Sequence, residues 1–208
     1  GGCLVFVNGC VYGLDGKQPK TYPVKSDTSF LYECFYWENV PVHCVMKAVT
    51  EGVEALYFGT IDGKICKLNT DVEGMDRFSD DGTPITAIWS TPADDDGDPM
   101  VLKTLLKKGN AVTIKPYTRS SAKVSFRTDK DAVDWQVTEG TMDIFDWEDI
   151  DFSRFTFNAN DAPAEIPFNR KVKNYKRLQI IVKNDAINEG FGVYGIVKHF
   201  VTGNFAKR

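Results

Sequence analysis

The stretch ALYFGTIDGKICKLNTD, residues 55–71, decides the fold class of this chain. Its apolar residues alternate with polar ones on both sides of Asp62-Gly63, a dipeptide that tolerates the positive φ of a tight turn. The pattern predicts a β-hairpin in which Asp62 and Gly63 form a two-residue turn.

A second copy of this pattern lies near the start of the chain. Residues 4–16, LVFVNGCVYGLDG, place Asn8-Gly9 at the turn, and Gly63 follows Gly9 by 54 positions. Hairpins that recur at a fixed period are typical of β-propeller blades, whose period is usually ~40–50 residues, so an inserted loop would explain the excess. The repeat predicts three pairs of equivalent positions in two related sheets: Val5 and Phe58, Val11 and Ile65, and Leu14 and Leu68.

The periodicity divides the chain into two predicted modules of an all-β protein. Residues 30–37 and 42–49 are rich in aromatic and β-branched residues, so residues 1–79 are predicted to form a propeller-like antiparallel β-meander. The turn-forming cluster SDDGTP at 79–84 marks the boundary. Residues 80–208 are predicted to form a β-sandwich or jelly-roll-like domain from short alternating segments at 111–116, 122–128, 133–138, 152–158, 177–183 and 190–199.

Composition and charge restrict the class of partner. The chain has 208 residues, 42% of them hydrophobic and 26% charged, which is ordinary for a globular protein. A net charge of −4 argues against nucleic acid as a partner, since a phosphate-binding surface normally carries a basic excess. No apolar run approaches the ~20 residues that a membrane-spanning helix needs. We expect neither nucleic acid nor a membrane span.

The start of the chain lies directly inside a strand pattern, with no Met and no signal peptide. We therefore expect a piece of a longer protein, with further blades before residue 1, that is not secreted by a signal peptide. The five cysteines are an odd number and include no CxxC spacing, which argues against a disulfide framework and a zinc site. Cys10, Cys44 and Cys66 lie in alternating apolar runs, where we expect small buried hydrophobic residues in a protein folded in a reducing cytoplasm.

The acidic loop PADDDGDP, residues 92–99, suggests a calcium site but lacks the required spacing. An EF-hand loop that begins at Asp94 would need a bidentate Glu at its twelfth position, and Leu105 stands there. The loop is predicted to be a solvated turn between strands.

No catalytic set is evident in the sequence. The two histidines, His43 and His199, stand in strand patterns without a nearby cluster of metal ligands, and no GxSxG, HExxH or GxxxxGK[ST] string occurs. We expect no catalytic residue, no bound metal and no cofactor, so the protein is predicted not to be an enzyme.

The acidic and aromatic stretch DIFDWEDID, residues 143–151, is the one candidate binding segment. A glycosidase needs two carboxylates ~5–10 Å apart, but this spacing gives no basis for choosing an acid and a base. We expect the carboxylates to lie on a solvated loop and the aromatic residues to lie in the core. The alternative is a glycan-binding or glycan-cleaving site, in which Phe152 lies beside these binding residues: Trp135, Asp143, Asp146, Trp147 and Asp149.

The basic stretch RKVKNYKR, residues 170–177, has two interpretations. Cations for phosphates and a tyrosine for base stacking would suit nucleic acid. Strand geometry instead places Lys171, Lys173 and Tyr175 on one side, as on a solvated sheet face or an edge protected by lysines. The acidic chain as a whole favours the second interpretation.

Several of these segments resemble one family. The run YECFYWENVPVHCVMK from residue 32, LYFGTIDGKICKL ending at residue 68, DDGTPITAIWSTP at 80–92 and the strands at 176–200 are similar to the C-terminal part of a group of bacteriophage and prophage structural proteins. The resemblance implies propeller blades followed by a β-rich domain. It also implies a tail-associated virion protein, made in the bacterial cytoplasm, that acts through assembly contacts with other virion proteins or with copies of itself. A host-surface glycan is the partner in the alternative of a receptor-binding tail protein.

Overall fold

Nearly all regular structure in the chain is β-strand, which confirms the predicted fold class. The computed structural model describes residues 2–15, 33–50, 52–68, 74–130, 135–144, 150, 152–159 and 162–205. These residues form several small antiparallel sheets and two short 3-10 helices. Among them there is no helix with the length and apolar character needed to cross a membrane. The finer assignments of propeller blades and a jelly-roll sandwich stay predictions.

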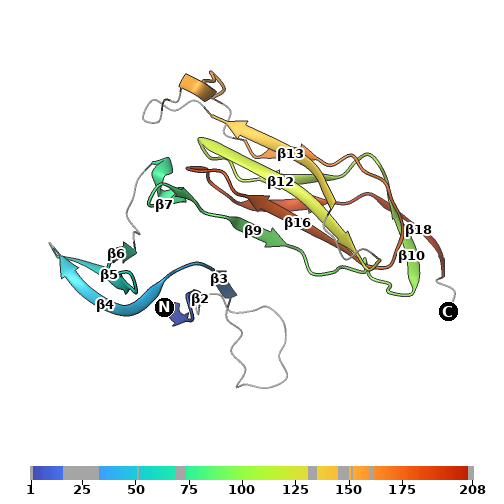
Figure 1. Ribbon diagram of the computed structural model, residues 1–208. Helices are drawn as coiled ribbons and strands as arrows, with labels where there is room; N and C mark the ends of the chain where they lie inside the picture. The colour runs from blue at the N-terminus through green and yellow to red at the C-terminus, as the bar shows by residue number, and fades with distance from the viewer. Residues whose placement is uncertain are drawn as a thin grey trace. The chain divides into compact units, whose positions relative to one another are not determined.

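The chain divides into two compact units (Figure 1). Unit 1 comprises Gly1–Asp71 and unit 2 comprises Val72–Arg208. Unit 1 contains two three-stranded meanders with the orders β1-β2-β3 and β4-β5-β6. Their strands are β1 (Gly2–Val7), β2 (Cys10–Asp15), β3 (Glu33–Trp37), β4 (Val42–Thr50), β5 (Val53–Thr60) and β6 (Ile65–Leu68).

The two repeated hairpins differ in their turns. Val7 pairs with Cys10, and both Asn8 (φ 50°) and Gly9 (φ 78°) have positive φ, so the predicted two-residue turn is confirmed there. The second prediction is wrong, because residues 61–63 form a three-residue loop in which the Thr60 N–H donates to the Lys64 carbonyl (2.9 Å) and the Gly63 N–H donates to the Thr60 carbonyl (3.1 Å). Such a loop needs positive φ at Gly63 alone, whereas the two-residue turn needs it at both positions.

The extra loop residue keeps the two hairpins in equivalent register. Val5 pairs with Tyr12, and Phe58 pairs with Cys66 at the matching place in the second hairpin. Burial is not equivalent, since Val11 is 1% exposed and Ile65 is 82% exposed. The reason is that β2 is the central strand of its sheet, whereas β6 is an edge strand.

The described residues of unit 2 form a hydrophobic core to which three sheets contribute. One sheet has the order β13-β12-β16-β9, and two three-stranded sheets have the orders β15-β10-β18 and β14-β11-β17. The bounds are β9 (Ala87–Ser90), β10 (Val101–Leu105), β11 (Ala111–Ile114), β12 (Arg119–Thr128), β13 (Trp135–Asp143), β14 (Ala164–Pro167), β15 (Val172–Tyr175), β16 (Leu178–Asn184), β17 (Val193–Val197) and β18 (Phe200–Phe205). Buried side chains from all three sheets belong to one cluster: Leu105, Val112, Ile114, Ala122, Val124, Phe126, Met142, Ile166, Phe168, Tyr175, Leu178, Ile180 and Val182.

The two three-stranded sheets follow one another end to end. Hydrogen bonds continue across the break, from the Leu106 N–H to the His199 carbonyl (2.8 Å) and from the Phe168 N–H to the Asn110 carbonyl (3.1 Å). The buried Asn110 side chain donates to the Leu106 carbonyl (2.7 Å) and accepts from the His199 N–H (2.8 Å). One amide side chain thus satisfies backbone groups on two strands where both are interrupted.

The N-terminal part of unit 2 packs against this core domain. It consists of η1 (Met75–Phe78) and the short hairpin of β7 (Ser79–Asp80) and β8 (Thr83–Pro84). The Phe78 ring meets Tyr117 edge-on at 5.2 Å, and the Asn188 side chain donates to the Asp76 carboxylate at 2.8 Å.

Three local predictions are wrong. Residues 152–158 begin with η2 (Phe152–Arg154) and then join no sheet, because their aromatic side chains contact one another. Cys44 is exposed, and Cys10 and Cys66 are half-buried, because unit 1 buries few of its apolar side chains. Tyr175 is fully buried instead of lying beside Lys171 and Lys173, because Asn174 has φ 58° and interrupts the alternation.

Candidate functional site

The predicted glycan-site residues do not all lie together. Trp135 pairs with Phe126 at one end of β13, and Asp143 pairs with Arg119 at the other end. Eight residue steps along a strand span roughly 26 Å. The structure therefore separates Trp135 from Asp143, and Asp146, Trp147 and Asp149 lie outside the described residues.

An exposed aromatic cluster lies at the Asp143 end of β13. The Phe152 and Phe155 rings stack at 6.2 Å with an interplanar angle of 11°, and Phe157 meets Phe155 edge-on at 4.8 Å. Phe152 is 85% exposed and Phe157 is 83% exposed. The Asn158 side chain donates to the Asp143 carbonyl (3.2 Å), which attaches this segment to the end of β13.

The sequence pattern did not predict that these aromatic side chains form a cluster. The Phe residues alternate with polar ones at 152–158, and the same alternation is typical of a half-buried strand. Exposed aromatic rings can stack on a flat ligand face or contact an apolar side chain of a partner protein.

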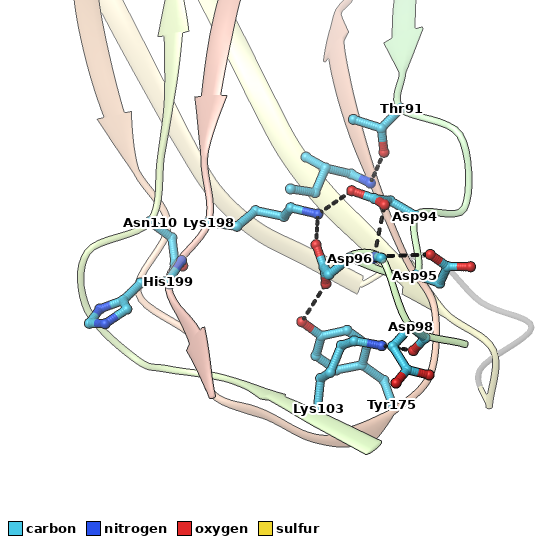
Figure 2. Close-up of polar contacts among 12 residues, drawn as sticks. Thr91, Asp94, Asp95, Asp96, Asp98, Lys103, Asn110, Tyr175, Lys198 and His199 are labelled. Atoms are coloured by element: carbon cyan, nitrogen blue, oxygen red, sulfur yellow. Dashed lines mark hydrogen bonds and ion pairs between the residues drawn. The ribbon is translucent and has the colours of Figure 1, made fainter. Parts of the chain in front are cut away.

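The acidic loop at 94–98 is the second polar site. It is a turn between β9 and β10 with exposed and half-exposed residues, as predicted, but it also contains an ion pair that was not predicted. Lys198, in the connection between β17 and β18, contacts an Asp96 carboxylate oxygen and lies 2.6 Å from Asp94 Oδ2 (Figure 2). Asp96 has φ 49°, and its backbone N–H donates to Asp94 Oδ1 at 2.9 Å. This turn directs both carboxylates at the buried end of Lys198. No local sequence pattern predicts the contact between Lys198 and these two aspartates.

A buried lysine and a buried tyrosine complete the surroundings of this loop. The Tyr175 hydroxyl donates to Asp96 Oδ2 at 3.5 Å. Lys103 is fully buried, and its ammonium donates to three backbone carbonyls, those of Asp98 (2.5 Å), Val101 (3.3 Å) and Lys176 (3.4 Å). These bonds hold the acidic loop against β10 and β15 (Figure 2).

The contacts in this cluster shift three protonation equilibria. Hydrogen bonds from Lys198 and from the Asp96 N–H lower the pKa of Asp94. Burial would lower the pKa of Lys198, but the hydrogen bonds to Asp94 and Asp96 outweigh it, so that pKa is raised. Burial and the nearby Asp96 charge raise the pKa of Tyr175, so its hydroxyl stays protonated and remains a donor.

The described residues contain no group of three or more His, Cys, Asp and Glu side chains that could hold a metal ion. At the acidic loop, the Lys198 ammonium takes the place between two carboxylates that a cation would occupy. His43 is exposed on β4, and His199 is exposed between β17 and β18.

One motif was overlooked in the sequence. Residues 190–195, GFGVYG, have the GxGxxG spacing of dinucleotide-binding loops. That function requires the glycines to open a helix whose N-terminus faces a pyrophosphate. Here they lead into strand β17, so the spacing is coincidental.

The chain matches no known protein-family model, and no curated protein is significantly similar to it in sequence.

Proposed function

We propose that this chain is a non-enzymatic structural protein of a bacteriophage or prophage virion, associated with the tail and acting through assembly contacts. It would be made in the bacterial cytoplasm and incorporated into the particle with other virion proteins or with copies of itself. The resemblance of the repeated hairpin, of the DDGTPITAIWSTP segment and of the C-terminal strands motivates this family.

The observation that carries the proposal is the exposed apolar surface of unit 1. Among the described residues, Val11 is the one hydrophobic side chain of unit 1 that is buried, whereas unit 2 has a full core. Apolar surface of this extent is typical of sites that contact another chain. Large apolar side chains are exposed on both meanders of unit 1: Val5, Val7, Tyr12, Phe35, Tyr36, Trp37, Val45, Met46, Val49, Val53, Ile61 and Ile65.

The direct test is the composition of particles. Mass spectrometry of density-gradient-purified particles from a strain that encodes the chain should find it as a stoichiometric component. Its absence from intact particles, with the protein present in the lysate, would contradict the proposal.

A matched pair of variants tests the contact surface. Ile65→Glu places a charge on the exposed edge strand β6, and Tyr194→Glu places one on an exposed position of β17 in unit 2. Ile65→Glu should reduce incorporation into particles, because it would bury a charge in an assembly contact. Equal incorporation of both variants would argue against a contact through unit 1.

The second candidate is a glycan-binding or glycan-cleaving module of a receptor-binding tail protein. The exposed cluster of Phe152, Phe155 and Phe157, whose segment is attached to the end of β13 by Asn158, favours it, with Trp147 as a further candidate from the sequence. On a glycan array, Phe157→Ala and Trp147→Ala should abolish binding, while Trp89→Ala, a change at an exposed aromatic residue on β9, should not. If the wild-type chain binds no glycan at millimolar sugar, only the proposal of a structural protein remains.

A further inference from the structure

The Lys198 amine and the Asp96 carboxyl are placed like the two partners of an amide bond. Lys198 Nζ contacts Asp96 Oδ1, so the nitrogen lies beside the carboxyl carbon (Figure 2). The Asp96 side chain is 5% exposed, and that of Lys198 is 18% exposed. Little water therefore surrounds the two groups, which favours condensation to an amide over its hydrolysis.

Two further side chains supply the proton chemistry that such a bond needs. Asp94 Oδ2 lies 2.6 Å from the same Nζ, within reach of the proton that the ammonium must lose before the amine can attack. The ion pair lowers the pKa of Asp94 and raises that of Lys198, so this transfer is uphill from the resting state. The Tyr175 hydroxyl donates to Asp96 Oδ2, which polarises the carboxyl group towards attack at its carbon. We propose that Lys198 and Asp96 form an intramolecular isopeptide bond, with Asp94 as the proton acceptor and Tyr175 as the hydrogen-bond donor to the reacting carboxyl group.

The step is balanced without any co-reactant. The Lys198 ammonium transfers one proton to Asp94, and the lone pair of the neutral amine attacks Asp96 Cγ. The Nζ–Cγ bond forms and one Cγ–O bond breaks. The departing oxygen takes up two protons that began on Nζ, one of them by way of Asp94, and leaves as water. The ammonium and the carboxylate become a neutral amide, and Asp94 and Tyr175 return to their starting states.

A second lysine–aspartate pair in unit 2 shows what distinguishes this site. Lys123 Nζ lies 2.6 Å from Asp185 Oδ1, so the partners are equally close. Both side chains are about one-third exposed there, and a second lysine, Lys183, shares the carboxylate at 3.0 Å. At Asp185 two ammonium groups share one carboxylate, whereas at Lys198 two carboxylates share one ammonium. An additional proton acceptor is thus present at Lys198.

The bond would fix the loop before β10 to the connection between β17 and β18. Asp96 and Lys198 are separated by 102 positions, so the bond would close a long loop of the chain. A covalent closure of this kind reduces the conformational entropy of the unfolded chain, as a disulfide does. It would need no oxidising compartment, because no electron is transferred.

The test is the intact mass of the purified wild-type chain, followed by digestion and tandem mass spectrometry. The wild-type mass should fall short of the sequence mass by one water, and a branched peptide should join the segment of Asp96 to that of Lys198. Because only the neutral Lys198 amine can attack, and its fraction grows as the pH rises, incubation at about pH 9 should increase the converted fraction over that at pH 7. Lys198→Met and Asp96→Ala should abolish the loss, Asp94→Ala should slow it, and the matched control Lys123→Met should retain it.

Two results would overturn the proposal. One is a wild-type chain that keeps its full mass after alkaline incubation and yields no branched peptide, a result that does not depend on the folding of any variant. The other is a loss of water that persists in Lys198→Met, which would place the modification at a succinimide of an Asp-Gly pair such as Asp96-Gly97.

Discussion

At the scale of single residues, close backbone approach constrains unit 2 at Gly190. An ideal Cβ atom at this position would lie 2.3 Å from Cγ of the Tyr117 ring. That ring packs edge-on against Phe78, and the Gly190 carbonyl accepts a hydrogen bond from the Ser120 hydroxyl at 2.9 Å. Neither side of the contact can move without loss of packing or of a hydrogen bond.

We expect Gly190→Ala to lower the free energy of unfolding by about 1–3 kcal/mol, because the added methyl group overpacks the Tyr117 contact. Urea unfolding followed by tryptophan fluorescence measures this. Gly195→Ala is the matched control, since no atom lies within 4 Å of its ideal Cβ, and it should change stability by less than about 0.5 kcal/mol. Similar effects of the two substitutions would show that the contact is not tight.

Individual residues also show where local sequence patterns lose their predictive value. Strand alternation predicted a common side for Lys171, Lys173 and Tyr175, but the positive φ of Asn174 turns Tyr175 into the core. The ion pair of the acidic loop was not predicted, because its partner, Lys198, is distant in sequence. Backbone reversals at one residue and contacts between distant loops leave no periodic signal.

At the scale of elements, the hairpins were predictable because their signals are local. Two alternating runs around Asn-Gly or Asp-Gly give the existence of both hairpins and the register of the first. The loop length of the second was not predictable, since Asp-Gly suits both a two-residue turn and the last two positions of a three-residue loop. In both hairpins the last left-handed position carries glycine, Gly9 or Gly63, and in the first hairpin the other left-handed position carries Asn8.

We expect Gly63→Val to lower the free energy of unfolding by more than about 1 kcal/mol, because a β-branched residue resists the φ of 80° at this position. Gly63→Asn is the control, since asparagine adopts positive φ more readily. Its effect, compared in thermal unfolding with that of Gly63→Val, should be clearly smaller. An unchanged melting temperature in Gly63→Val would contradict the assigned loop.

A second element-scale feature is the contact between the end of β12 and the link from β15 to β16. The Asp129 carboxylate accepts hydrogen bonds from the backbone N–H groups of Lys176 (2.8 Å) and Arg177 (3.2 Å). Burial would raise the pKa of Asp129, but these bonds outweigh it and lower the pKa below its ordinary value of 3.8. The ionised carboxylate therefore stabilises the folded state above about this pH.

That stabilisation should be lost as the pH falls from about 3.8 through the lowered pKa, because the unfolded chain binds the proton first. Asp129→Asn carries no titrating group, so its free energy of unfolding should depend less steeply on pH in this range. Urea unfolding at a series of pH values from about 6 to 3 measures the slope. An unaltered slope in Asp129→Asn would refute the assignment.

At the scale of the whole molecule, the two units differ in how they gain stability. Every residue of the main hydrophobic cluster belongs to unit 2, and the exposed apolar side chains of unit 1 have no comparable core among the described residues. The alternating patterns predicted strands in both regions but not this difference. Burial depends on which strands pair across long sequence distances, as β9 does with β16.

This difference predicts unequal folding of two fragments. Residues 72–208 should unfold cooperatively on their own, because their core closes without unit 1, and a domain of this size can bury enough apolar surface to be stable. Residues 1–71 should lack a cooperative transition, because they bury too little apolar surface to offset the entropy of ordering the chain. Circular dichroism during heating of both fragments tests this, with the full chain as the reference. A cooperative transition in residues 1–71 alone would show that unit 1 needs no partner, and would remove the main structural support for assembly through its surface.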